Sequence, residues 1–71
     1  MDIFCEQLRF WRKQKGFSQL DLSVESGVSS RHISFLETAR AKPSKDMVLL
    51  LADTLDIPLR DRNKLLTYAG F

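Results

Sequence analysis

Apolar residues recur along the chain at the three- and four-residue spacing of an amphipathic helix, in five successive segments. None of these segments shows the strict alternation of apolar and polar residues that is typical of a β-strand. The pattern predicts an all-α fold of five helices, arranged as one domain over residues 1–71. The apolar residues that mark the segments are Ile3, Phe4, Leu8, Phe10, Trp11, Leu20, Leu22, Val24, Ile33, Leu36, Met47, Leu50, Leu51, Leu55, Leu59, Leu65, Leu66 and Tyr68.

Glycines and small polar residues indicate where the first three helices begin and end. Gly16 supplies the left-handed backbone that ends the first helix. Ser18 is expected to cap the second helix, with Asp21 three residues later as the partner of a capping box. Gly27 then closes the second helix, and Ser29 is the expected cap of the third.

The second half of the chain shows a loop and two further helix starts. Residues 38–42 have no apolar period, which indicates a loop. Pro43 and Ser44 are typical of a helix start, with Ser44 as the cap of the fourth helix. Pro58 interrupts the pattern again, and residues 59–68 are expected to form the fifth helix.

The segment from residue 18 to residue 37 has the layout of a helix-turn-helix, in which two short helices are joined by a tight turn with a glycine. Its second helix opens with Ser29, Ser30, Arg31 and His32, which can form hydrogen bonds but fill no core. In this motif the second helix enters a DNA major groove about 12 Å wide, while the first crosses the backbone. The polar residues at the start of this helix therefore predict contacts with base edges and phosphates.

Composition excludes several other kinds of protein. The single cysteine, Cys5, leaves no partner for an internal disulfide, and one cysteine with one histidine cannot build a zinc site. No apolar run is long enough to span a membrane, and no secretory leader is evident. These features predict a cytoplasmic protein that is stabilised by packing alone, without metal or cofactor.

Charge is distributed unevenly along the chain. Residues 1–45 hold eight Lys or Arg and five Asp or Glu, whereas residues 46–71 hold three and four. The first part therefore has a net charge of +3 and the second a net charge of −1. An excess of basic residues in one part of the chain suggests a surface that binds a polyanion. The same excess is also found in proteins whose charged residues are only solvated.

Four stretches together resemble the helix-turn-helix domain of the phage repressor and Cro class, the XRE family. They are "LRFWR", "GFSQLDLS", "SGVSSRHISFLE" and "PSKDMVLLLADTLDIP", and the resemblance extends from about Leu8 to Leu66. The continuation to Phe71 is similar to bacterial regulators in which such a domain precedes a PAS-like sensory domain. A stand-alone regulator and a fragment of a longer one are both compatible with this resemblance.

The resemblance implies a role for individual residues. It implies base contacts from the outward face of the third helix, phosphate contacts from three parts of the motif, and an ion pair between Arg12 and Glu37. The expected base-reading residues are Ser30, Arg31, Ser34 and Phe35. The expected phosphate-binding residues are Gln19, Ser29, Arg40, Lys42 and Lys45. Ala39 stands where relatives usually have glycine, so the turn after the third helix is expected to differ or to be strained.

Several of these residues have a second interpretation. Arg31 is either a DNA contact or a solvated arginine, and His32 fits packing or an ordinary surface position better than chemistry. Phe35 is expected either to fill the edge of the core or to contact a thymine methyl group. Phe10, Trp11, Tyr68 and Phe71 are expected in the core, although residues 59–71 are also a candidate homodimer seam.

The sequence therefore predicts a module of a prokaryotic or phage transcription regulator, acting as a repressor on palindromic double-stranded DNA. The alternative is a protein-interaction module on the same fold, such as an antitoxin-like partner. An enzyme is not expected, because no nucleophile or acid has a base partner other than His32, and no cofactor motif is present.

Overall fold

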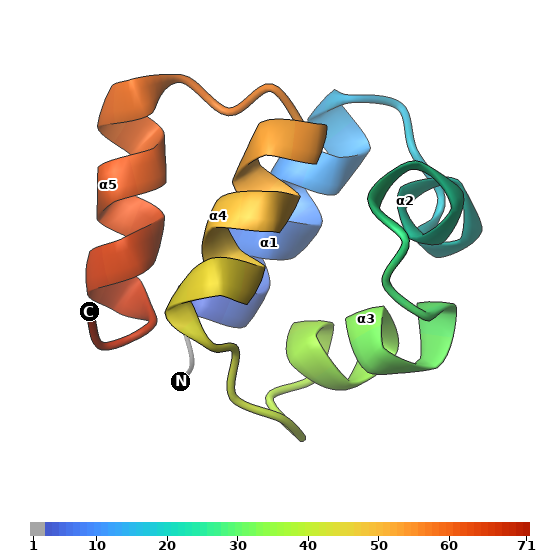
Figure 1. Ribbon diagram of the computed structural model, residues 1–71, viewed down its shortest axis with the longest axis horizontal. Coiled ribbons are helices and arrows are strands. Elements are labelled where there is room, and N and C mark those ends of the chain that lie inside the picture. The colour runs from blue at the N-terminus through green and yellow to red at the C-terminus, as the bar shows by residue number, and fades with distance from the viewer. Residues whose placement is uncertain (1–2) are drawn as a thin grey trace.

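In the computed structural model, which describes residues 3–71, the chain forms five helices and no strand within that range (Figure 1). The helices are α1 (Ile3–Gln14), α2 (Gln19–Ser26), α3 (Ser30–Glu37), α4 (Lys45–Thr54) and α5 (Leu59–Tyr68). The predicted all-α fold with five helices is confirmed.

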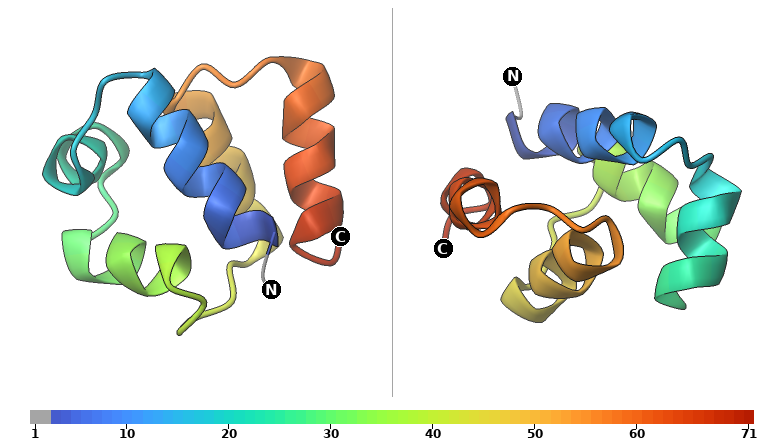
Figure 2. Two further views of the ribbon diagram at one scale, coloured as in Figure 1. Left: turned by 180° about the vertical axis from the view of Figure 1, so that it is seen from behind. Right: turned by 90° about the horizontal axis from the view of Figure 1, so that it is seen from above.

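The helices surround a common centre. Seen from above, α1 and α4 lie on opposite sides of the molecule, with α5 at one end and the α2–α3 pair at the other (Figure 2). Helix α1 packs against α3 and α5, α2 packs against α3 and α4, and α4 packs against α5. The motif expected between residues 18 and 37 is therefore held by both α1 and α4.

Every helix contributes to one apolar core. Leu22 and Ile33 are completely buried at its centre, and each side chain of this size contributes about 1.5–3 kcal/mol when fully removed from water. Two connecting segments also contribute, through Val28 after α2 and Ile57 after α4. The core residues are Phe4, Leu8, Leu22, Val28, Ile33, Leu36, Val48, Leu51, Ala52, Leu55, Ile57 and Leu65.

The apolar stripe expected on α4 is confirmed at Leu51 and Leu55 and wrong at Leu50, while Met47 is partly buried. The buried residues of this segment are Val48, Leu51, Ala52 and Leu55, whereas Leu50 is 41% exposed. One residue corresponds to a rotation of about 100° around a helix, so Leu50 faces away from the core although Leu51 faces into it. Three adjacent leucines give the sequence no means of choosing between the two stripes.

Other apolar residues that were expected inside are exposed. Leu59, at the first residue of α5, and Tyr68, at its last, are 69% and 42% exposed, so they are wrong as inner residues. Phe10 and Phe71 are also exposed, and Phe10 packs edge-on against the half-buried Trp11. Only the middle of α5 reaches the core: Leu65 is buried and Leu66 is partly buried, as predicted.

The predicted helix caps are confirmed. The Ser18 hydroxyl accepts a hydrogen bond from the backbone N–H of Asp21, and the Asp21 carboxylate accepts one from the backbone N–H of Ser18, which completes the capping box. Ser29 and Ser44 cap α3 and α4 in the same way, by accepting from backbone N–H groups three residues later. Orphan N–H groups at three helix starts are thus satisfied.

Four of the helices end in the same kind of turn. The second residue after the helix has a positive φ, and the next backbone N–H bonds back to a carbonyl five residues earlier, as in the Schellman motif. The bonds are Phe17 to Arg12, Arg40 to Phe35, Ile57 to Ala52 and Phe71 to Leu66. The positive-φ residues are Gly16, Ala39, Asp56 and Gly70.

Ala39 keeps this left-handed conformation, with a φ of 60°, although it is not glycine. Relative to glycine, alanine in this region carries a steric penalty of about 1–2 kcal/mol, partly offset by the lower entropy of its unfolded chain. The expected strain after the third helix is therefore present, and the turn itself is retained.

Replacing Ala39 by glycine should raise the free energy of unfolding by about 0.5–1 kcal/mol, because it removes the steric penalty at positive φ. Ala69→Gly is the control, since Ala69 has a φ of −81°, so glycine there relieves no strain and should destabilise the protein through added chain entropy and the loss of a partly buried methyl group. Thermal or urea unfolding measures both changes. Destabilisation by Ala39→Gly would contradict the strain.

The capping box should make stability depend on pH. Hydrogen bonds from the backbone and then from the side chain of Ser18 lower the pKa of Asp21. A carboxyl group with a lowered pKa in the folded state stabilises the protein above its unfolded pKa and loses this effect as pH falls through the folded value. The wild-type protein should therefore unfold at a higher temperature than Asp21→Asn at neutral pH, and the gap should close in acid.

Thermal unfolding between pH 7 and pH 2 measures this gap. Asp46→Asn is the control, because Asp46 lies in the first turn of α4, where Met47 occupies the position of the box partner. A gap for Asp21→Asn that persists unchanged to the lowest pH would mean that the carboxylate charge contributes nothing.

Candidate nucleic-acid interface

A short turn fixes the angle between α2 and α3. Gly27 has a φ of 79°, and its N–H bonds to the Ser23 carbonyl at 2.9 Å, which ends α2. The next residue, Val28, is buried, and its N–H bonds to the Ser26 hydroxyl. In Figure 1, α2 is seen along its axis while α3 lies across the view, so the two helices cross steeply. A side chain at position 27 would be strained, because L-residues rarely adopt this φ.

One side of α3 is fixed in the protein and the other is exposed. Ile33, Leu36 and Glu37 are buried on the inner side. Ser30 and Arg31, at the start of the helix, are exposed, while His32, Ser34 and Phe35 are half-buried. The helix thus rests on the core through its second half and offers its first turn to solvent.

The end of α3 is tied to α1 by an ion pair between Arg12 and Glu37. Arg12 Nε lies 2.7 Å from Glu37 Oε2, and Arg12 Nη2 lies 2.9 Å from Glu37 Oε1, so the contact is bidentate. The side chains are only 11% and 2% exposed, respectively. The hydrogen bond to Glu37 raises the pKa of Arg12 against the opposing effect of burial, and the attraction of the two charges adds to it.

Three further hydrogen bonds complete this cluster. Arg12 Nη1 donates to the Phe17 carbonyl at 3.0 Å, and Gln19 Nε2 donates to Glu37 Oε1 at 3.2 Å. Arg9 Nη1 donates to the backbone carbonyl of Glu37 at 3.3 Å. The Arg12–Glu37 pair therefore joins α1, the turn after it, the start of α2 and the end of α3.

Hydrogen bonds within the protein orient Gln19 and Ser29, two of the candidate phosphate-binding residues. One N–H of the Gln19 amide bonds to Glu37, which orients the group and leaves the second N–H of the NH₂ for another acceptor. The Ser29 hydroxyl accepts from the His32 backbone N–H at 3.1 Å, and a hydroxyl that accepts keeps its own proton for donation. Both residues can thus serve the fold and still donate to a phosphate.

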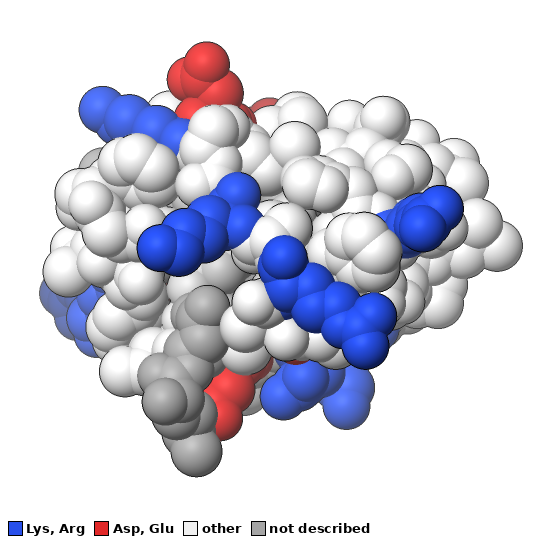
Figure 3. All heavy atoms as spheres, turned by 90° about the horizontal axis from the view of Figure 1, so that it is seen from below, with Lys and Arg blue, Asp and Glu red and all other residues white. Residues whose placement is uncertain are grey.

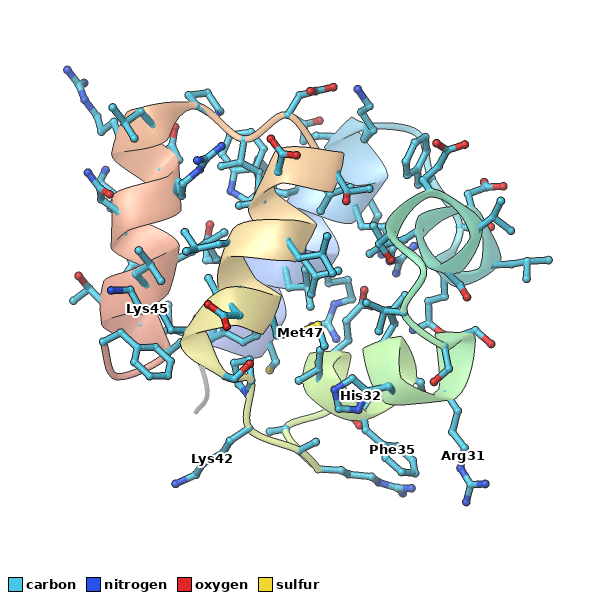
Figure 4. The ribbon with its side chains drawn as sticks, in the orientation of Figure 1. Arg31, His32, Phe35, Lys42, Lys45 and Met47 are labelled. Atoms are coloured by element: carbon cyan, nitrogen blue, oxygen red, sulfur yellow. The ribbon has the colours of Figure 1, made fainter. Side chains whose placement is uncertain are left out.

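The candidate DNA-binding cations on α3 and after it do not all point in the same direction. Arg31 and Lys42 project from the lower side of the molecule in Figure 4, as does the Phe35 ring, whereas Lys45 points sideways from the start of α4. Figure 3 shows that lower side face-on, with Lys and Arg side chains across its centre and few acidic groups. Arg40 and Lys42 are exposed in the loop that follows α3. Lys45 is thus placed apart from Arg31 and Lys42.

The sequence left two interpretations of Phe35 open, a place at the edge of the core and a contact with a thymine methyl group. The ring is half-buried rather than part of the core, and two guanidinium groups approach it. The Cζ atom of Arg31 is 5.5 Å from the ring centroid, and that of Arg40 is 5.9 Å away, within the range of cation–π contacts. We call these three residues the Arg–Phe cluster.

Two features of this site were not evident from the sequence. Arg9 donates to the backbone carbonyl of Glu37 at the end of α3. Arg40 was expected only as a phosphate contact in a loop, and the turn at Ala39 also brings it near the Phe35 ring. Neither contact has a signature in sequence spacing, because each joins residues from different elements.

Comparison with known proteins identifies this arrangement. The sequence model of a family described as "Helix-turn-helix" matches residues 8–61, which include the motif and most of the core. The chain belongs to the XRE-type helix-turn-helix family. Members of this family are DNA-binding domains rather than enzymes, so the chain is a DNA-binding helix-turn-helix module. No similar curated protein and no similar solved structure was found.

Residues 3–71 bring no three His, Cys, Asp or Glu side chains together as a metal site. No helix in the same range is long and apolar enough to cross a membrane.

Substitution of Glu37 by glutamine should lower the free energy of unfolding by about 3–5 kcal/mol, because it leaves the buried Arg12 charge without a counter-charge. Replacing both charges, in Arg12→Met/Glu37→Leu, should cost less than Glu37→Gln alone, because no charge is then stranded. Chemical denaturation of the three proteins tests this order. A Glu37→Gln variant that melts within a degree or two of the wild type would show that the pair contributes little.

Proposed function

We propose that the module reads specific sequences in double-stranded DNA, as the DNA-binding part of a prokaryotic or phage transcription regulator that acts as a repressor. The observation that carries this proposal is the division of α3 into an inner side held by Ile33, Leu36 and Glu37 and an exposed first turn with Ser30 and Arg31. A helix fixed in this way can enter the major groove without leaving its place in the core.

The base-reading residues of the proposal are Ser30, Arg31, Ser34 and Phe35. Arg31 is the strongest of them, because a guanidinium that projects from an exposed first turn can donate two hydrogen bonds to guanine O6 and N7. Ser30 and Ser34 have small hydroxyls that suit either base edges or phosphates.

The phosphate contacts of the proposal come from both sides of α3. Gln19 and Ser29 lie at helix starts, where backbone N–H groups and the helix dipole also favour an anion. Arg40 and Lys42 are exposed in the loop that follows α3. Lys45 is the weakest candidate, because its side chain points away from Arg31.

The proposed regulator acts as a homodimer on a palindromic site. A contact along the exposed side of α5 is not proposed, because Arg60, Asn63, Lys64 and Thr67 make that side polar. The exposed apolar residues Ile3, Tyr68 and Phe71 instead lie near the start of α1 and the end of α5, and Ile3 and Tyr68 line one shallow hollow. Repression then needs only that the dimer covers a promoter and excludes the polymerase.

The proposal assigns different tasks to Arg31 and Lys42. Arg31→Ala should weaken binding to the preferred duplex by about 1–3 kcal/mol and relax the choice at one base pair. Lys42→Ala should weaken binding to all duplexes equally and reduce the slope of log K against log salt by about 0.9, the value for one phosphate contact. The duplex is first selected from random sequences, and titrations at several salt concentrations then measure both effects.

The same titrations distinguish the outcomes. Equal losses for Arg31→Ala on the selected and a scrambled duplex would show that Arg31 contacts phosphate only. Duplexes with one half-site and with two report the stoichiometry of binding. Absence of any salt-dependent binding to DNA would favour the alternative of a protein-interaction module, because protein contacts release far fewer counterions.

A further inference from the structure

The Arg–Phe cluster brings together three side chains that do not stabilise the fold in an obvious way. Arg31 and Arg40 are exposed, so two positive charges share one aromatic ring at the surface. The ring itself points away from the helices in Figure 4, on the same side as the guanidinium of Arg31. The ring attracts both guanidinium groups, but the two positive charges repel each other, so the cluster is more stable when an anion lies beside the guanidinium groups and an apolar group covers the free surface of the ring.

The major groove offers both of these groups at neighbouring positions. Guanine presents N7 and O6 to an arginine, thymine presents a 5-methyl group to an apolar side chain, and the phosphates provide the anions. No guanine pairs with thymine in an ordinary duplex, so the methyl group and the guanine must belong to different base pairs. Successive base pairs are separated by about 3.4 Å along the helix axis.

The size of the cluster limits how far apart the two contacted base pairs can be. The Cζ atom of Arg31 lies 5.5 Å from the centre of the Phe35 ring, with the two residues one helical turn apart on α3. A guanidinium bonded to guanine therefore holds the ring beside the next base pair and not several pairs away. Arg40, from the loop, lies near the same ring, with its Cζ atom 5.9 Å from the ring centroid.

We propose that the Arg–Phe cluster recognises a 5-methylpyrimidine directly beside a guanine. Arg31 donates to the guanine, the Phe35 ring covers the 5-methyl group of the neighbouring thymine or 5-methylcytosine, and Arg40 holds the ring from the backbone side. The proposal rests on the proposed function, and it adds that the methyl group is itself part of the recognised sequence.

Removal of that methyl group from the DNA is the direct test. In the duplex selected by the wild-type chain, each thymine next to a guanine is replaced in turn by deoxyuridine, which differs only by the 5-methyl group. One such replacement should raise Kd about threefold to fivefold per half-site, the effect of burying one methyl group. At the same position, 5-methylcytosine should bind more tightly than cytosine by a similar factor.

Two protein variants show which side chain senses the methyl group. Phe35→Ala should bind the thymine and deoxyuridine duplexes equally, while Lys42→Ala, the matched control, should weaken both and keep the ratio between them. Thermal unfolding shows whether Phe35→Ala remains folded. The wild-type measurements on thymine, deoxyuridine, cytosine and 5-methylcytosine do not depend on this variant.

The possible results separate this inference from the proposed function. If the wild type binds a specific duplex but tolerates deoxyuridine at every position beside a guanine, the inference is wrong and the proposed function stands. If Phe35→Ala keeps the full preference for thymine, another residue reads the methyl group, and the inference is again wrong. If no duplex is preferred over another, the proposed function itself fails.

Discussion

The position of α3 depends on one buried interaction, the bidentate ion pair between Arg12 and Glu37. Its two charges lie 25 residues apart in the chain and link the end of α3 to α1. Because both are almost fully removed from water, loss of either would leave the other as a buried charge without a counter-charge. The bonds to the Phe17 carbonyl and from the Gln19 amide extend the same constraint to the start of α2. One polar cluster thus fixes both helices of the motif.

This arrangement explains how an eight-residue helix can present an exposed first turn. A helix of this length is marginal by itself, and it forms here because its second half is packed and bonded to the domain. Burial of Ile33 and Leu36 supplies the apolar part of that anchorage, and Glu37 supplies the polar part. The first turn can then contact DNA while the second half of the helix keeps its packing. A helix that contacts base edges requires both.

The turn after α3 connects the fold to the proposed recognition surface. The bond from the Arg40 N–H to the Phe35 carbonyl reverses the chain within three residues, and the Thr38 N–H is also bonded internally, to Ser34. These two backbone amides are therefore engaged in ending the helix and are not available as phosphate donors. What the turn contributes instead is the side chain of Arg40, which it places against the Phe35 ring. Strain at Ala39 is part of the cost of this placement.

The sequence by itself determined the features that arise from neighbouring residues. The five helices, the caps Ser18, Ser29 and Ser44, and the glycine turn were predictable, because each depends on bonds within a few residues. The Arg12–Glu37 pair was expected only through the resemblance to a family, since nothing in the spacing of the two residues indicates that they meet.

Only the tertiary structure decided which side of each helix is covered and which distant side chains meet. Leu50 and Leu51 are equally apolar, and the choice between them depends on where α4 lies against its neighbours. Leu59 and Tyr68 are exposed because α5 is covered only along its middle. The Arg–Phe cluster depends on a backbone reversal that carries Arg40 back to α3, and a reversal of this kind sets distances that no local pattern encodes.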